Sequence, residues 1–292
     1  MRVGFVGFPF PRHRMMAQRL LDAGYKIHIH DTERDRAASL LESGAEWASS
    51  PQNVAQQCSL IFTALALPNE AEQAICGDNG ILAGAAPKTI LCDMTVCQPT
   101  MSKMLAKRSL SHEVNFLDTP VTGGFGDAKV TMFVGGDSEI VERCKIIFEL
   151  FSNEVFHVGE VGSGAMFKLI HEHIVLSFGL VIDEAIVLGE KAGIPGIRLY
   201  ALLKASVAAP LVMAPIAAGM DSKLTQMPEK VGTLTATASA MLLAVDMAAR
   251  LGVEAPLCRA AAEIYRKTLA EGYVDSHLST LTRYRRNAGL AD

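Results

Sequence analysis

The segment after the first apolar run has the residue types of a phosphate-binding turn. It reads Gly7-Phe8-Pro9-Phe10-Pro11-Arg12, and Asp31 follows the next apolar run. A glycine turn between a strand and a helix offers backbone N–H groups to a pyrophosphate, and an acidic residue after the second strand binds the ribose. These residues therefore predict a dinucleotide site.

The turn departs from the usual Gly-x-Gly-x-x-Gly pattern. Only the first glycine is present, Pro9 has no N–H, and Arg12 stands where the third glycine would let the helix approach the strand. Arg12, His13 and Arg14 begin a helix whose N-terminal dipole favours an anion. They either rebuild the phosphate site or form a solvated basic helix end.

Asp31 carries two interpretations. As a ribose ligand it favours NAD over NADP, because its carboxylate accepts the 2′-hydroxyl and repels a 2′-phosphate. Thr32 follows it, so no arginine comes directly after the carboxylate. Asp31 is equally placed to be the N-cap of a helix over residues 33–41.

Strands and helices must alternate in the first half to position these residues. Short β-rich runs are separated by segments with apolar residues three and four positions apart, and they cover residues 3–6, 26–30, 60–63, 89–92, 114–117, 131–134 and 154–157. The repeated β-α-β pattern predicts an α/β fold with a Rossmann-type, mostly parallel sheet.

The second half is predicted to be helical. A proline-free helix from about residue 164 to 191 would be roughly 42 Å long, and further helices are expected near 197–206, 233–251, 256–271 and 278–287. A long helix that is apolar on more than one side is usually buried between domains or subunits. We expect a dinucleotide-binding domain over residues 1–161 and an all-helical domain over 162–292.

Five segments occur in the order seen in one enzyme family, and the resemblance covers essentially the whole chain. They are Val3 to Gly7, Ala66-Leu67-Pro68, Asp93-Met94-Thr95, Asp118-Thr119-Pro120-Val121-Thr122-Gly123-Gly124, and Gly162-Ser163-Gly164 with Lys168. The chain resembles the β-hydroxyacid dehydrogenases, such as 3-hydroxyisobutyrate dehydrogenase and tartronate semialdehyde reductase. The resemblance implies a Rossmann domain, a C-terminal domain like that of 6-phosphogluconate dehydrogenase, and a cleft for nicotinamide and a small hydroxy acid.

The resemblance also implies roles for individual residues. Lys168 matches the general acid/base, which protonates the alkoxide formed when a hydride reaches an aldehyde. Thr122, Gly123 and Gly124 match the segment that binds the substrate carboxylate, although the same residues also suit an ordinary turn between strands. The cofactor, NAD rather than NADP, would contact Gly7, Phe8, Pro9, Arg12, Asp31, Leu67, Pro68, Thr95 and Val96.

Glu172 lies one helical turn after Lys168, where the family usually has an amide. An ion pair there would stabilise the charged lysine, so we expect Glu172 to contact the substrate and to alter specificity. The alternative is a surface Lys–Glu pair. His171, Glu172 and His173 are consecutive and point about 100° apart on a helix, which predicts no metal site.

The sequence leaves alternatives to an NAD-dependent oxidoreductase acting on a small β-hydroxy acid or semialdehyde. A divergent relative without normal redox activity, serving as a ligand-binding or partner subunit, is supported by the altered turn. Val96, Ser239 and Ala240 also replace polar residues that relatives carry near the cofactor. A third alternative is a non-redox enzyme that uses Lys168 and Glu172 for proton transfer.

Composition restricts the partners and the compartment. The chain has 292 residues, 50% of them hydrophobic, and a net charge of -4, which excludes a disordered tail and any global attraction to nucleic acid or anionic membranes. The 6 cysteines lie singly, and the first apolar run is broken by Pro9. We expect a cytoplasmic protein with reduced thiols, no membrane span, and a homodimeric or homotetrameric state.

Overall fold

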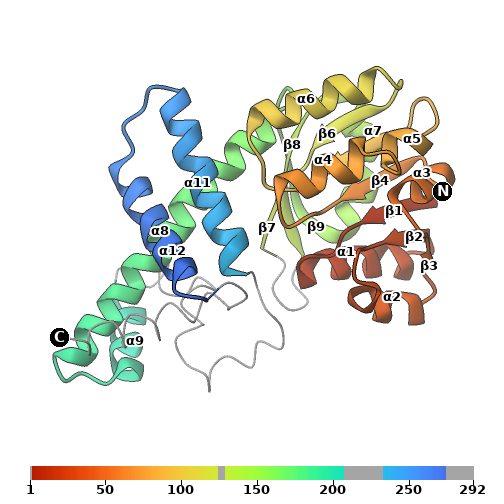
Figure 1. Cartoon of the computed structure of the whole chain (residues 1–292). Helices are drawn as coiled ribbons and strands as arrows, with labels where there is room; N and C mark the ends of the chain where they lie inside the picture. Colours follow the sequence, from red (N-terminus) through yellow and green to blue (C-terminus); the bar gives the residue numbers. More distant parts are fainter. Residues whose placement is uncertain (1, 124–128, 207–232, 274–292) are drawn as a thin grey trace. The chain divides into compact units, whose positions relative to one another are not determined.

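β-Branched and aromatic residues form short strands that alternate with helices in the first part of the chain (Figure 1). The computed structural model describes residues 2–123, 129–206 and 233–273. The chain divides into two units, Met1–Leu169 and Ile170–Asp292. The sequence predicts a division earlier, between residues 161 and 162, just before a long helix begins.

The described strands of the first unit form one nine-stranded sheet. They are β1 (Arg2–Val6), β2 (Lys26–His30), β3 (Glu46–Trp47), β4 (Leu60–Thr63), β5 (Ile90–Asp93), β6 (Asn115–Asp118), β7 (Val121–Gly123), β8 (Val130–Gly135) and β9 (Ser152–Gly159). The order is β3-β2-β1-β4-β5-β6-β8-β7, with β9 beside β8. Neighbours from β3 to β6 are parallel, whereas β8 is antiparallel to β6 and β7 and parallel to β9. The predicted Rossmann-type, mostly parallel sheet is confirmed.

Helices cover both faces of this sheet. They are α1 (Pro11–Asp22), the 3-10 helix η1 (Arg34–Ala37), α2 (Ala38–Glu42), α3 (Pro51–Gln57), α4 (Pro68–Cys76), α5 (Ile81–Gly84), α6 (Pro99–Leu110) and α7 (Ser138–Phe151). Four of those named here, α1, α3, α4 and α6, begin on proline, which suits the first helical position because its missing N–H would have no helical partner.

Successive side chains of β1 point to opposite faces and enter different cores. Phe5 packs in a cluster with Met16 of α1 and Phe148 of α7, and the Phe5 and Phe62 rings lie 4.9 Å apart between centroids. Val6 packs in the second cluster, which contains residues of α3, α4, α5 and α6. This alternation fixes the direction in which the residues after β1 leave the sheet.

The second unit is helical where it is described. α8 (Ser163–Lys191) begins in the first unit and is followed by α9 (Gly196–Lys204), α11 (Leu234–Arg250) and α12 (Pro256–Ala270). Tyr265 of α12 is fully buried, and its hydroxyl donates a hydrogen bond of 3.1 Å to the Leu176 carbonyl of α8. The helical C-terminal region is confirmed, whereas the helix predicted over 278–287 lies outside the described residues.

α8 is the one described helix that meets the length and composition criteria for crossing a membrane. It has 29 residues, and an 18-residue window has a mean hydropathy of 1.5 with 39% of that window buried. Core helices of soluble proteins satisfy the same criteria. The sequence predicts no membrane span, and α8 carries the charged residues Lys168, Glu172 and Asp183.

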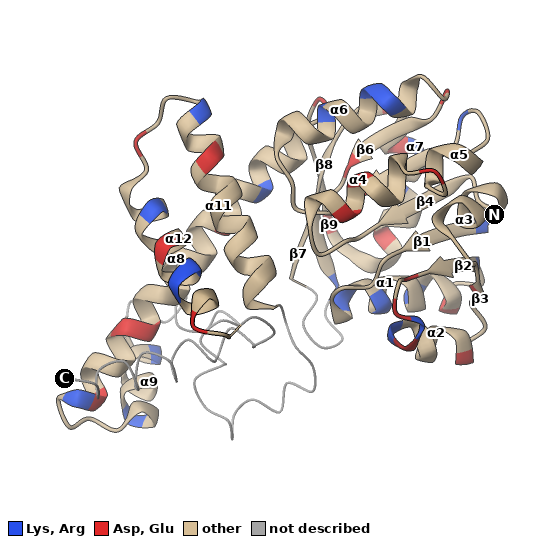
Figure 2. Cartoon of the chain, in the orientation of Figure 1, with Lys and Arg blue, Asp and Glu red and all other residues tan. Residues whose placement is uncertain are grey.

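Charged residues are dispersed over the two units, and the cysteines are free thiols. Figure 2 shows acidic and basic residues distributed along the helices and strands of both units. All of the cysteines lie in described segments, and each is a free thiol. Burial raises the pKa of Cys58 and Cys97 to about 12, so these two thiols stay protonated near neutral pH.

Candidate functional site

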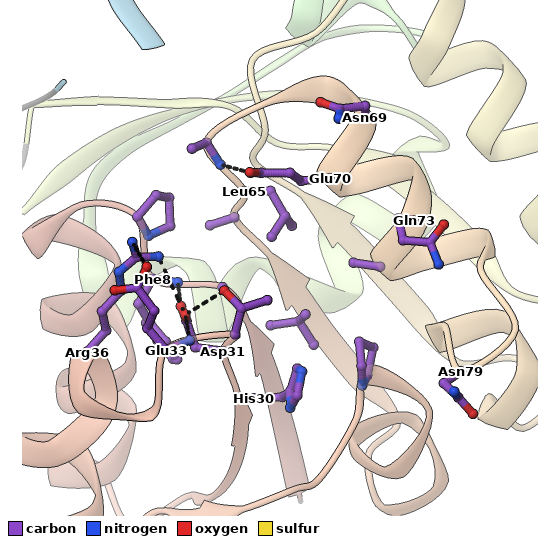
Figure 3. A pocket seen from close by; sticks show the side chains of 18 of the residues that line it. Phe8, His30, Asp31, Glu33, Arg36, Leu65, Asn69, Glu70, Gln73 and Asn79 are labelled. Carbon is purple, nitrogen blue, oxygen red and sulfur yellow. Dashed lines mark hydrogen bonds and ion pairs between the residues drawn. The ribbon is translucent and has the colours of Figure 1, made fainter. Parts of the chain in front are cut away.

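A pocket of about 640 Å³ lies where β1, β2 and β4 end (Figure 3). It is lined by the turn after β1, by the segment after β2, and by the start of α4 with the residues that precede it. The carboxyl ends of parallel strands are where ligands bind in sheets of this type. The predicted cofactor residues Gly7, Phe8, Pro9 and Asp31 all line this pocket.

Gly7 makes the close approach on which the turn depends. Its φ is +88°, a conformation that favours glycine. A Cβ atom would collide with the Ala64 carbonyl oxygen, so the turn passes directly against the segment after β4. The Gly7 N–H donates to the His30 carbonyl at 2.9 Å, which joins the turn to the end of β2.

The Asp31 carboxylate accepts hydrogen bonds from the segment before it and from the segment after it. Its Oδ2 accepts the Phe8 N–H at 2.7 Å, and its Oδ1 accepts the Glu33 N–H at 2.8 Å. The carboxylate therefore holds the turn after β1 and also the N–H of Glu33, and Glu33 rather than Asp31 is the N-cap of the next segment. That segment is η1 followed by α2 rather than one helix over residues 33–41.

Arg36 is a pocket residue that sequence reasoning missed. Its Nη1 lies 3.5 Å from Asp31 Oδ1, and its Nη2 lies 2.6 Å from Glu33 Oε1. Figure 3 shows the three side chains together beside Phe8. From the sequence, an arginine was considered only at the position directly after Asp31. The 3-10 helix η1 turns the chain back, so that Arg36, five positions later, reaches the Asp31 carboxylate.

The first turn of α1 places the side chains of Arg12 and His13 differently. Its buried side chains include His13 and Met16, while Arg12 is only partly buried and its guanidinium lies 5.4 Å from the centroid of the Phe10 ring. The position that packs inward is thus His13, whereas the side chain of Arg12 stays partly exposed. The helix begins at Pro11, so its third residue is the first to face the sheet.

Lys168 lies early in α8, whose start is fixed by a buried carboxylate. Asp118, at the end of β6, accepts the N–H groups of Gly162 at 2.8 Å and Ala165 at 2.7 Å. A Cβ on Gly164 would lie 2.7 Å from the Phe133 carbonyl oxygen, so the helix start is pressed against the sheet. Lys168 follows within the next turn and is buried, with 5% of its surface exposed.

His13 and Lys168 are close enough to interact. Burial lowers the pKa of His13 well below its usual range, and the charges of Arg12, Lys168 and Arg14 lower it further. All four residues belong to the unit Met1–Leu169. The turn after β1 is therefore hydrogen-bonded to Asp31 through Phe8. The residue His13, just after this turn, is close enough to Lys168 for the lysine charge to lower its pKa.

Thr95 joins the ends of two neighbouring strands. Its Oγ1 accepts the Leu65 N–H at 3.1 Å, and its own N–H donates to Asp93 Oδ1 at 3.1 Å. Val96 follows and is partly buried. These two predicted cofactor residues lie in the loop after β5, and the hydroxyl of Thr95 is used within the fold.

Leu67 and Pro68 begin α4 without lining the pocket. Leu67 is its N-cap and Pro68 its first residue, and the Glu70 carboxylate accepts the Leu67 N–H at 3.1 Å. The pocket is lined by their neighbours Ala66, Asn69 and Glu70. The predicted pair therefore lies within this segment, whereas the side chains that line the pocket are those of its neighbours.

The predicted carboxylate segment is strand rather than loop where it is described. Thr122 and Gly123 belong to β7 and pair with Thr131 and Val130 of β8, and Gly123 has a φ of +79°. Gly124 lies outside the described residues. Gly123, the last residue of β7, therefore has a backbone conformation that favours glycine.

Glu172 lies one turn after Lys168 in α8. Its Oε1 is 3.6 Å from His171 Nδ1, and both side chains are partly buried. Among the residues that the structure describes, no group of three His, Cys, Asp or Glu side chains is placed to hold a metal ion.

Two family models together match almost the whole chain. Residues 3–159 match the NAD-binding domain of 6-phosphogluconate dehydrogenase, which is more than half of the sequence. Residues 162–284 match the NAD-binding domain of NADP-dependent 3-hydroxyisobutyrate dehydrogenase.

Individual relatives agree with these matches. The probable mitochondrial 3-hydroxyisobutyrate dehydrogenase of Dictyostelium discoideum is 31% identical over 70% of this chain and 65% of its own length, so the match spans less than two thirds of that relative. The NAD-dependent L-serine dehydrogenase of Pseudomonas aeruginosa is 26% identical over 96% of this chain and 95% of its own. A 3-hydroxyisobutyrate dehydrogenase structure from Salmonella typhimurium has the same fold, with a TM-score of 0.88 at 20% identity, covering 97% of this chain and 99% of that one.

Proposed function

Because this chain belongs to the β-hydroxyacid dehydrogenase family, we propose that Lys168 is its general acid/base in hydride transfer between NAD(H) and a small β-hydroxy acid or semialdehyde. At the family level the chain is an NAD(P)-dependent oxidoreductase of β-hydroxy acids. One observation carries the proposal: Lys168 is buried at the start of α8, and its charge acts on His13 of the phosphate turn.

The residues present fit a bound dinucleotide. Gly7 leaves no room for a Cβ, and Asp31 lines the pocket at the ends of the strands. A carboxylate has about four acceptor positions, so Asp31 can accept a ribose hydroxyl while it holds Phe8 and Glu33. Its charge disfavours a 2′-phosphate, although Arg36 partly offsets that charge, and we infer a preference for NAD over NADP.

When bound, the nicotinamide supplies or accepts the hydride. The Lys168 amine takes the proton from the substrate hydroxyl as the carbon is oxidised, and it returns a proton to the oxygen in the reverse direction. Burial of the amine suits this role, because it keeps bulk water away from the proton that is transferred. Thr122, Gly123 and Gly124 hold the carboxylate through a hydroxyl and backbone N–H groups, and Glu172 contributes to the choice of substrate.

A second candidate is a family member without redox activity that binds a ligand or a partner. The turn favours it, because Pro9 and Pro11 have no N–H to offer a phosphate. The two functions differ in one simple measurement. Thermal unfolding with NADH shifts upward if the cofactor binds, and no shift with NAD(H) or NADP(H) would favour the second candidate.

Replacement of the lysine tests the proposed mechanism. In Lys168→Ala we expect kcat for a β-hydroxy acid substrate, identified from a panel of hydroxy acids and semialdehydes, to fall by about 10²- to 10⁴-fold. The NADH dissociation constant should stay within about two-fold, because the dinucleotide contacts come from the turn and Asp31. Lys107→Ala, an exposed lysine of α6, is the control and should keep full activity. Undiminished turnover in Lys168→Ala would remove the lysine from the mechanism.

A further inference from the structure

The phosphate turn has few backbone donors for a ligand. Of the residues from Gly7 to Pro11, two are prolines without an N–H, and the Gly7 and Phe8 N–H groups are bonded to His30 and Asp31. Phe10 therefore supplies the one remaining backbone N–H within this five-residue turn. A pyrophosphate in folds of this type normally receives several such donors.

His13 offers a further donor next to this turn. Its side chain is 5% exposed, and its Nδ1 is buried without a hydrogen-bond partner among the residues that the structure describes. A buried polar nitrogen without a partner costs free energy, so it indicates a group that acquires its partner from a ligand. The ring also lies 5.7 Å from the ring of Phe10, the N-cap of α1.

The surroundings of His13 suit an anion. α1 has 12 residues, and its first turn contains no acidic side chain. Arg12, Arg14 and Lys168 all place positive charge near the imidazole, and together with burial they lower the pKa of His13. The ring is thus neutral and carries one N–H, which donates without adding a further charge to the helix start.

We propose that His13 is a cofactor-contacting residue whose imidazole donates a hydrogen bond to the pyrophosphate of the bound dinucleotide. This rests on the proposed function, since it assumes that the turn binds NAD(H). The imidazole replaces backbone donors that Pro9 and Pro11 cannot provide. It does so from the side of the turn near Lys168, whereas Asp31 holds the side that lines the pocket.

Two adenine nucleotides separate a pyrophosphate contact from general damage. ADP-ribose contains the pyrophosphate but no nicotinamide, and AMP contains a single phosphate. His13→Met replaces the imidazole with an apolar side chain of similar length that can fill the same buried space in α1. In this variant we expect the dissociation constants of ADP-ribose and NADH to rise about ten-fold or more. That of AMP should change by less than about two-fold.

Two further variants control for packing. His13→Gln keeps an N–H donor and should bind ADP-ribose within about three-fold of the unmodified chain. Met16→Leu changes the next buried residue of α1 and should bind all three nucleotides normally. Calorimetric titration measures each constant, and thermal unfolding reports whether each variant folds.

Several results would overturn the proposal. One is unchanged ADP-ribose affinity in His13→Met. Others are a loss of affinity in this variant that is equal for ADP-ribose and AMP, or that affects NADH alone. The last is an equal loss of ADP-ribose affinity in His13→Met and His13→Gln. If His13→Met does not fold, the imidazole ¹⁵N resonances of the intact protein decide instead. Those of His13 should move with ADP-ribose and not with AMP, and any other pattern contradicts the contact. Failure of the unmodified chain to bind NADH would instead remove the proposed function itself.

Discussion

At the scale of single residues, the buried carboxyl of Asp93 should make the free energy of unfolding depend on pH. It is 1% exposed at the end of β5, and burial raises the pKa of its carboxyl from 3.8 to about 6. The folded chain therefore binds more protons than the unfolded chain between these values. Its contribution to stability is full below about pH 4 and is lost as the pH rises through about 6.

Asp93→Asn removes this charge while its amide oxygen can still accept from Thr63 and Thr95. We expect the variant to exceed the unmodified chain in free energy of unfolding by up to about 3 kcal/mol above pH 7, and the difference to vanish near pH 4. Urea unfolding at several pH values measures it, with the exposed Asp22→Asn as a control. A less stable Asn variant at pH 7.5 would mean that the hydrogen bonds of the charged form outweigh its burial.

Sequence could predict single residues only where local pattern sets their place. Gly7 and Asp31 line one pocket because each directly follows a strand, and the strand ends meet at one edge of a parallel sheet. Arg36 was missed because its approach to Asp31 depends on the path of η1. The burial of His13 was not predicted, because the residue that faces inward depends on where the helix begins.

At the scale of elements, the start of α8 should control the position of Lys168. Asp118 accepts two N–H groups there, and Asp137 accepts those of Glu139 and Ile140 in the same way at the start of α7. Removal of either carboxylate leaves helix donors without partners. We expect Asp118→Ala and Asp137→Ala each to lose about 1–2 kcal/mol of unfolding free energy.

The two cap variants should differ in catalysis. α7 carries none of the proposed site residues, so Asp137→Ala should keep its kcat, whereas in Asp118→Ala we expect kcat to fall about ten-fold through displacement of Lys168. Steady-state kinetics together with NADH titration measure both effects, and NADH affinity should be retained. Equal kcat values for the two variants would show that α8 does not position the lysine through this cap.

Elements were predictable in proportion to their length. The long helix was expected from about residue 164 to 191 and spans Ser163–Lys191, because its apolar periodicity extends over many turns. β3 and β7 have 2 and 3 residues and were not predicted, since such segments contain too few side chains to alternate. Their pairing is set by neighbouring strands rather than by local sequence.

At the scale of the whole molecule, the order of motifs along the chain predicted the fold more reliably than any single motif. The dinucleotide turn alone, with one of three glycines, is a weak indication. The family was nevertheless identified correctly, because five segments occur in register over both halves. The resemblance could not predict the contacts of the turn after β1, because the family has the Gly-x-Gly-x-x-Gly pattern there and this chain does not.

The exposed apolar face of α8 leads to a prediction about assembly. Ile170, Ile174 and Phe178 are spaced four residues apart, so they share one side of the helix, and they are 46%, 50% and 41% exposed. An apolar stripe of this kind gains stability when another subunit covers it. We therefore expect a homodimer or homotetramer in aqueous buffer without detergent, although the helix is also long enough to cross a membrane.

Ile174→Asp tests this assembly because it places a charge in the middle of the stripe, where covering it would be costly. We expect a shift towards monomers, measured by light scattering after size-exclusion chromatography over a range of concentrations. Leu110→Asp is the matched control, since Leu110 is 73% exposed at the end of α6 and lies outside the stripe. A monomeric unmodified chain at tens of micromolar, or an Ile174→Asp variant with unchanged mass, would mean that this face of α8 does not bind a second copy. Retention of the unmodified chain in the membrane fraction, with release by detergent alone, would point instead to the bilayer as the partner of the stripe.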